Sequence, residues 1–255
     1  MAAACGQGSK ETDGGLGGAV ALVSEAGSSS GTLVGYFGAF DANAVAADPC
    51  SGREYDPCCL LPAGTGMASS SPLVFPALLD FMGAGTLTVT DKTTGEAMGA
   101  VEPSPGQSYL SSQLGTWAAG DMLSLAAKGG AFPAFSGSVQ SPPPLAGVNP
   151  LLIPGASGSE VLTIPTTADF AVSWTPDATT DQILGTMGGA TSSIVVCYGH
   201  ESDGQMIFPT ELMISQADTD GQLALLRTRW TYLAGSTSTV ALGATVGLTT
   251  NVSLH

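Results

Sequence analysis

The sequence contains few basic residues. Lys and Arg total 6 against 21 Asp and Glu, and the formal net charge is −15 at pH 7. Such a surface repels phosphate backbones and anionic headgroups, which argues against nucleic acid as a partner. Charged residues make up only 11% of the chain, and the carboxylates are spread along it. This spread is typical of solubility in an exported Ser-, Thr- and Gly-rich protein; an acidic cation-binding surface is the alternative.

Long apolar runs are also missing. No run reaches the roughly 18 residues of a membrane helix, and the apolar residues 73–79 are interrupted by Pro76. The chain instead combines 35 Gly and 16 Pro with 44% apolar residues, which favours a turn-rich β protein with a sizeable core. Its 255 residues suffice for one large all-β domain or two smaller ones.

Short alternating segments separated by turn residues predict about fourteen strands. The fold class is therefore predicted as all-β, an antiparallel β-sandwich of immunoglobulin-like or jelly-roll-like type, built as one large sandwich or as two packed halves. A single helical turn is predicted at residues 209–214 and a hairpin at residues 193–209. The main predicted strands cover residues 19–23, 32–40, 85–90, 96–101, 107–110, 122–127, 135–140, 161–164, 169–174, 193–198, 222–233 and 239–248.

A proline run suggests how the chain is divided. Ser141 is followed by Pro142, Pro143 and Pro144, which cannot lie in a central strand and favour a rigid connector. We therefore expect a tether over residues 1–18, an N-terminal β half over residues 19–140 and a C-terminal β half over residues 145–255. A cysteine-bearing loop is predicted over residues 41–71, where no periodicity survives.

The stretch 169–209 is interpreted as the centre of the sandwich. Phe170, Val172 and Trp174 alternate with smaller residues and share one face. In residues 222–233, Arg227 and Arg229 lie on one face of the predicted strand and Trp230 on the other. Trp174 and Trp230 are predicted to pack in a common interior rather than to bind sugar.

The first residues resemble the end of a bacterial lipoprotein signal peptide, with small residues directly before Cys5. The basic region and apolar stretch of such signals are missing, so we expect an upstream part to have been removed or the start to be assigned late. Cys5 is then the lipidation site, and the Gly-rich residues that follow suit a flexible tether. The alternative is a chance Ala-rich start with a free Cys5.

Four further cysteines, Cys50, Cys58, Cys59 and Cys197, suggest two disulfides in an exported protein. A bridge between the adjacent Cys58 and Cys59 needs a strained eight-membered ring and is discounted. We expect Cys50 to pair with one of them and Cys197 with the other, which would pin the loop to a core strand. A zinc site is disfavoured by this spacing and by the presence of only two His residues.

No catalytic residues are predicted. His200, Ser202 and Asp203 are close in sequence, but they fall in an expected turn, and a hydrolase site is the minor alternative. Asp218, Asp220 and Gly221 resemble the beginning of a calcium loop, yet an apolar strand follows, so a plain turn is expected. Trp117 is the candidate exposed aromatic of a glycan-binding module. No cofactor or metal is predicted.

Short motifs resemble those of uncharacterised secreted lipoproteins of the myxobacterial group. They are Cys5 with its preceding residues, residues 84–89, residues 118–125 followed by 132–135 and Pro142, and residues 172–175 followed by Cys197, Asp203 and Phe208. The adjacent Cys58 and Cys59 depart from the wider spacing of that group. The resemblance implies a β-sandwich on the cell surface or in the periplasm, and it supplies no functional residue.

The sequence therefore predicts a non-catalytic, extracytoplasmic lipoprotein with a structural or adhesive role. It would be anchored to the outer membrane or cell surface by lipid and would face an unknown envelope or glycan partner. A glycan- or calcium-binding module is the second hypothesis and a hydrolase the third.

Overall fold

The protein is all-β, as predicted, with sheets packed face to face. The computed structural model describes residues 16–26, 28–40, 50, 52–61, 81–104, 108–154, 157, 160–188, 193–217, 219–235 and 237–255. Three sheets are present in these residues, with nine, four and three strands. Most pairings are antiparallel, but β1 and β10 both run parallel to β16.

The nine-stranded sheet is built around its two longest strands, β15 (Thr219–Ala234) and β16 (Ser238–Leu254), which pair over 16 positions. Its strand order is β3-β13-β12-β15-β16-β1-β2-β6, with β10 beside β16. The other members are β1 (Leu16–Glu25), β2 (Gly31–Ala39), β3 (Cys58–Leu61), β6 (Tyr109–Leu114), β10 (Leu162–Ile164), β12 (Gln182–Gly188) and β13 (Ile194–His200).

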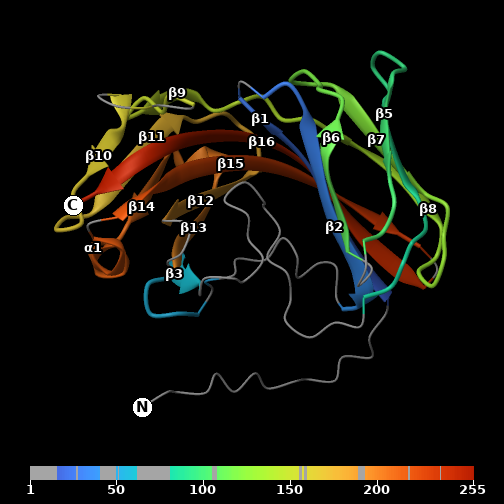
Figure 1. The fold of residues 1–255 in the computed structure, drawn as a ribbon, viewed down its shortest axis with the longest axis horizontal. Helices are drawn as coiled ribbons and strands as arrows, with labels where there is room; N and C mark the ends of the chain where they lie inside the picture. Colours follow the sequence, from blue (N-terminus) through green and yellow to red (C-terminus); the bar gives the residue numbers. More distant parts are fainter. Residues whose placement is uncertain are drawn as a thin grey trace.

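Two smaller sheets pack on this one. The four-stranded sheet has the order β5-β4-β7-β8 and the three-stranded sheet the order β14-β11-β9. Figure 1 shows β15 and β16 as an arch, with the four-stranded sheet at one end and the three-stranded sheet at the other. Their strands are β4 (Leu87–Asp91), β5 (Ala97–Val101), β7 (Met122–Ala127), β8 (Phe135–Gln140), β9 (Ala146–Asn149), β11 (Phe170–Thr175) and β14 (Gln205–Phe208).

Each small sheet covers a separate hydrophobic core on the same face of the large sheet. Successive side chains of a strand point to opposite faces, so residues of equal parity share a face. In β16, Leu242 and Ala244 belong to the core under the four-stranded sheet, and Val252 and Leu254 to the core under the three-stranded sheet. One pair of strands therefore supports both cores.

The proline run lies between the two small sheets. Pro142 to Pro144 connect β8 of the four-stranded sheet to β9 of the three-stranded sheet. The core beneath the four-stranded sheet nevertheless includes Val240 and Leu242 of β16, and β1 pairs with β16. The N-terminal strands thus pack against the C-terminal end of the chain. The division into a tether and two halves stays a prediction.

Three strands were not predicted from the sequence: β3, β9 and β12. β12, in the stretch between the predicted strands 169–174 and 193–198, is a buried strand between β13 and β15. Gly185 and Gly188 make this stretch look unlike a strand in the sequence. Packing between the layers leaves no room for a side chain at Gly185. A Cβ at Gly185 would lie 2.8 Å from the Phe208 ring and closer still to the sulfur of Met206, both on β14. β3 is a short strand inside the predicted cysteine-bearing loop.

The predicted hairpin at residues 193–209 is wrong. β13 belongs to the large sheet, whereas β14 pairs with β11 in the three-stranded sheet. The chain crosses between the layers through a short 3₁₀ segment, Glu201–Asp203, which ends at the left-handed Gly204. The strands therefore contribute to one core from its two sides.

The tryptophan prediction is half right. Trp174 is 4% exposed and lies in the core beneath the three-stranded sheet. Trp230 is half-buried and packs on the opposite face of the large sheet, beside Tyr36 of another cluster. Because residue 230 has the opposite parity to the core-forming Leu225 of β15, the two indoles cannot share an interior.

A helical turn is present where it was predicted, as α1 (Thr210–Met213), and Pro209 precedes it as the N-cap residue. Among the described residues, no helix has the length and apolar content needed to cross a bilayer.

Candidate functional site

Both disulfides form between the predicted cysteines. Cys50 is joined to Cys59, and Cys58 to Cys197. Cys58 and Cys197 are directly opposite each other in the antiparallel pair of β3 and β13. Neighbouring side chains of a strand point to opposite faces, so Cys59 must point away from Cys197. The adjacent cysteines therefore serve two separate bridges, one on each face of the sheet.

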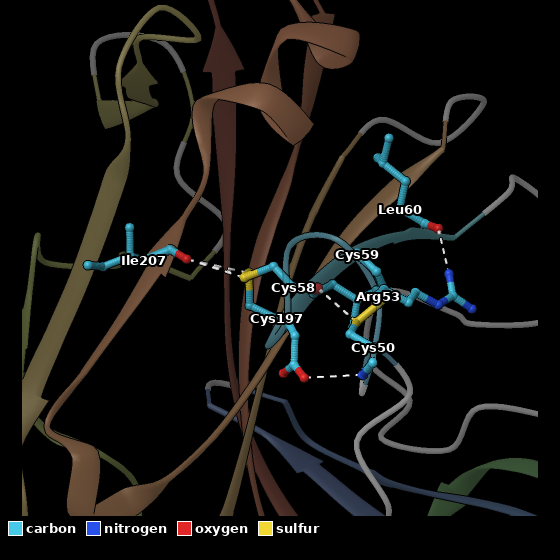
Figure 2. The surroundings of a disulfide bond; sticks show 10 residues. Cys50, Arg53, Cys58, Cys59, Leu60, Cys197 and Ile207 are labelled. Atoms are coloured by element: carbon cyan, nitrogen blue, oxygen red, sulfur yellow. Dashed lines mark hydrogen bonds between the residues drawn. A yellow bond between two sulfur atoms is a disulfide. The ribbon is translucent and has the colours of Figure 1, made fainter.

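The surroundings of the bridges tie three segments together (Figure 2). The carbonyl oxygen of Ile207, on β14, lies 3.3 Å from Sγ of Cys58 and 3.7 Å from Sγ of Cys197. On the other side, Sγ of Cys50 lies 3.5 Å from the carbonyl oxygen of Val196. Arg53 donates to the carbonyl oxygen of Leu60 at 3.4 Å, which closes the segment before β3.

The second feature is a cluster of charged side chains, which we name the polar seam: Asp177, Asp181, Glu201, Arg227 and Arg229. Arg227 and Arg229 project from β15 on the face that carries both hydrophobic cores, between Leu225 and Leu233. The predicted placement of the two arginines on one face and Trp230 on the other is thus confirmed. The polar seam lies between the core beneath the four-stranded sheet and the core beneath the three-stranded sheet.

Asp181 is the centre of the polar seam. It is 4% exposed and accepts hydrogen bonds from Nε of Arg227 at 2.8 Å and from Nε and Nη2 of Arg229 at 2.7 and 2.9 Å. Arg229 also donates through Nη1 to Oε1 of Gln140, at the end of β8, at 3.0 Å. The guanidinium of Arg229 thus connects the four-stranded sheet to the segment that leads into β12.

Two further carboxylates complete the polar seam. Asp177 accepts from Nη2 of Arg227 at 2.8 Å, and this hydrogen bond holds the pKa of Asp177 well below its usual range. Glu201 is 1% exposed, and burial raises its pKa. Its carboxylate accepts the backbone N–H of Asp177, and its carbonyl oxygen accepts the indole N–H of Trp174 at 2.7 Å. These contacts fix the geometry of the crossing between the layers.

A hollow of about 580 Å³ lies beside the polar seam, where β12 begins next to β15. The indole N–H of Trp230 donates to Oε1 of Gln182 at 2.5 Å, which fixes the orientation of the ring. The ring also packs across Gly243, the residue opposite it on β16. The hollow is lined by Ala178, Thr179, Thr180, Asp181, Gln182, Thr228, Arg229, Trp230 and Tyr232.

The residues considered for hydrolysis are not arranged as a triad. Asp203 accepts the backbone N–H of His200 at 2.7 Å, so its carboxylate supports the chain turn rather than the imidazole. Ser202 lies in the same 3₁₀ segment. This arrangement matches the interpretation of these residues as turn-forming.

Of the two calcium candidates, Asp218 lies outside the described residues. The prediction that Asp220 lies in a turn is wrong. Asp220 is part of β15, opposite Ser253, whose hydroxyl donates to it at 2.9 Å. Within the described part of the chain, no group of three or more His, Cys, Asp and Glu side chains is placed to hold a metal ion.

Trp117, the candidate glycan platform, is half-buried and packs against the core beneath the four-stranded sheet. Its ring lies on Gly31, where a Cβ would collide with it. Its buried Nε1 has no hydrogen-bond partner among the described residues. Cys5 lies outside the described residues, so its lipidation stays a prediction.

The polar seam and the hollow were not found as sites from the sequence. The only signal was the pair Arg227 and Arg229 in a chain with 6 basic residues. Their partners Asp177 and Asp181 are 50 and 46 residues before Arg227, in a segment for which no strand was predicted. Spacing along the chain cannot reveal such a long-range arrangement.

No family model matches the chain, and no curated protein matches it. The solved structures that are similar include a tetra-tandem repeat in the extending region of a large adhesion protein, at 15% identity and a TM-score of 0.24 over 93% of this chain and 49% of that chain. A segment of two fibronectin type III domains from chicken tenascin matches at 14% identity and a TM-score of 0.22, over 63% and 81% of the two chains.

A Ca²⁺-stabilised adhesin with which an Antarctic bacterium binds ice is similar at 12% identity and a TM-score of 0.22, over 93% of this chain and 49% of that one. The chain thus spans about half the length of two of these three structures. At TM-scores this low, the likeness supports no conclusion about function.

Proposed function

We propose that the chain is an exported, non-catalytic β-sandwich module with a structural or adhesive role at the cell envelope. In this proposal, Cys5 carries the lipid that anchors the module to the outer membrane or cell surface. The observation that carries the proposal is the pair of disulfides, Cys50–Cys59 and Cys58–Cys197.

The disulfides support export because of where such bonds persist. Disulfides form in oxidising compartments and are rare in the cytosol, where thiols are kept reduced. All four bridged cysteines are at most 4% exposed: Cys50, Cys58, Cys59 and Cys197. Both bridges are thus part of the packed interior, which favours folding in a compartment that supplies an oxidant.

The shared sheet supports a structural or adhesive role. β15 and β16 pair over 16 positions and pass beneath both hydrophobic cores. A force that separates these two strands must therefore break a long ladder of hydrogen bonds. Arg229 adds a link from the end of β8 to the segment before β12. A module of this build can hold its shape under load and present a fixed surface to a partner.

The test is the location and modification of the protein in the organism that makes it. Cells are labelled with a clickable fatty acid and fractionated, and free thiols are blocked before lysis. We expect the label in the membrane fraction, its loss in Cys5→Ser and its retention in the control Cys50→Ser. Recovery of unlabelled protein with free Cys58 and Cys197 from the cytosol would contradict the proposal. Deletion of the gene is expected to weaken cell–cell or cell–surface attachment, which a retention assay under flow measures.

A glycan-binding role is the second candidate. It is favoured by one observation, the hollow beside Trp230.

A further inference from the structure

We infer that the hollow beside Trp230 is a binding site for a neutral saccharide. This inference deepens the proposed adhesive role, on which it rests, by naming the chemical class of the partner. It moves the aromatic platform from Trp117, the sequence candidate, to Trp230.

The Trp230 ring is held in one orientation beside the hollow. The indole packs against the sheet at Gly243, where a Cβ would lie between 2.7 and 3.0 Å from three of its ring carbons. Its N–H is bound to Gln182, so the ring cannot rotate without breaking a hydrogen bond. Trp230 is half-buried and lines the hollow. A fixed ring is an apolar platform of the kind on which the C–H face of a sugar packs, at little entropic cost.

Polar side chains form a rim around the hollow. Arg229 is 26% exposed and carries five N–H donors, of which three are used for Asp181 and Gln140. Thr180 adds a hydroxyl to the lining. Because Asp181 holds Arg229 in place, the remaining donors point in fixed directions. Sugar hydroxyls, which both donate and accept, suit such a rim.

The charges at the hollow favour a neutral ligand. Among the described residues, Arg229 is the only cation that lines the hollow, and Asp181, the only anion there, is bound to it directly. The two charges compensate each other, and the whole chain carries a net charge of −15. An anionic ligand would be repelled by the chain as a whole. A cation would meet a carboxylate whose oxygens already accept three hydrogen bonds. A neutral ligand meets neither difficulty.

Size agrees with this class of ligand. The hollow of about 580 Å³ falls within the range of small-molecule sites, roughly 300–1,000 Å³. The hollow is open to solvent, and most of its lining residues carry polar groups. These properties suit a polyhydroxylated ligand better than a lipid.

The test uses the purified full chain on an array of neutral gluco-, galacto- and mannooligosaccharides together with sialylated and sulfated glycans. Binding of at least one neutral glycan is expected, and titration calorimetry then gives its affinity. Trp230→Ala is expected to weaken binding about tenfold or more. Gly243→Ala keeps the indole but displaces it and is expected to weaken binding as well. The matched control Trp117→Phe is expected to leave the affinity within about twofold of the original.

A second measurement does not depend on a variant that folds. In the wild-type protein, titration with the bound sugar is expected to shift the indole N–H resonance of Trp230, assigned from the contacts of its ring with Gly243, and not that of Trp117. No binding of neutral glycans, binding of acidic glycans alone, or a response confined to Trp117 would each overturn the inference. A negative result with both disulfides intact leaves the proposed export unaffected, because export is tested by lipid labelling and thiol blocking.

Discussion

Replacement of Asp181 by Asn tests whether the polar seam stabilises the fold. Asp181 is 4% exposed and accepts three hydrogen bonds from Arg227 and Arg229. The Asn side chain retains one carbonyl oxygen and turns an amide N–H₂ toward the guanidiniums. Arg227, 2% exposed, would lose its closest buried anion. Breaking a buried ion pair costs about 3–5 kcal/mol.

We expect a loss of about 3 kcal/mol, at the lower end of this range, because two features soften the effect. Arg227 keeps its contact with Asp177, and Arg229 is 26% exposed and can reach water. For a chain of this size, such a loss lowers the melting temperature by roughly 6–12 °C. The assay is urea unfolding followed by Trp fluorescence. The slope of the unfolding free energy against urea concentration is expected to be the same as in the wild type.

Asp177→Asn is the matched control for Asp181→Asn. Asp177 bonds the same guanidinium of Arg227, but it is 41% exposed, so its removal is expected to cost no more than about 1 kcal/mol. If Asp181→Asn unfolds within 1 kcal/mol of the wild type, or if Asp177→Asn costs as much as Asp181→Asn, the reasoning about buried charge is refuted.

The other predictions concern pH, the disulfides and β12. Burial raises the pKa of Glu201, so the folded state binds the proton of this carboxyl group more tightly than the unfolded chain does. The stabilisation from this proton is present at low pH and is lost as the pH rises through the folded-state pKa. Glu201→Gln is expected to abolish this loss of stability, which urea unfolding between about pH 4 and 7 measures. The pKa of Asp177 is lowered by Arg227, so the stabilisation from its ionised carboxylate is present above about pH 4 and is lost at lower pH. Asp177→Asn is expected to reduce the fall in stability between neutral and acidic pH. Paired Cys→Ser replacements are expected to cost about 3 kcal/mol for Cys50–Cys59 and about 5 kcal/mol for Cys58–Cys197, because the bridges span 9 and 139 residues; equal losses in denaturant titrations would count against this loop-entropy argument. Gly185→Val is expected to cost about 1–3 kcal/mol because its side chain would enter the space of Phe208, and an unchanged melting temperature would show that the layers are not in contact there.

The all-β class and most strands could be predicted because alternation and turn residues are local signals. Phe170 to Thr175 and Leu87 to Asp91 show the period of two that one buried face imposes. The disulfide pairing could be limited to two alternatives from the adjacency of Cys58 and Cys59. The choice between them depends on which face of β3 meets β13, and the short run Cys58 to Leu61 gives no sign of a strand.

The remaining features depend on contacts between distant parts of the chain. Gly185 looks like a strand breaker until the side chains of Met206 and Phe208 are seen above it. Trp230 looks like a core residue, but its parity in β15 places it on the face opposite Trp174. The hollow exists because β12 begins at Gln182 while β15 continues to Ala234. A difference in strand ends of this kind has no local pattern in the sequence.

The most direct test of the central claim is the mass of the protein recovered from its native compartment. Free thiols are alkylated under denaturing conditions, and the intact mass is measured before and after reduction and a second alkylation. If the sandwich is an oxidised, exported module, Cys50, Cys58, Cys59 and Cys197 accept the label only after reduction. Labelling of these four cysteines before reduction would contradict both the bridged core and the oxidising compartment.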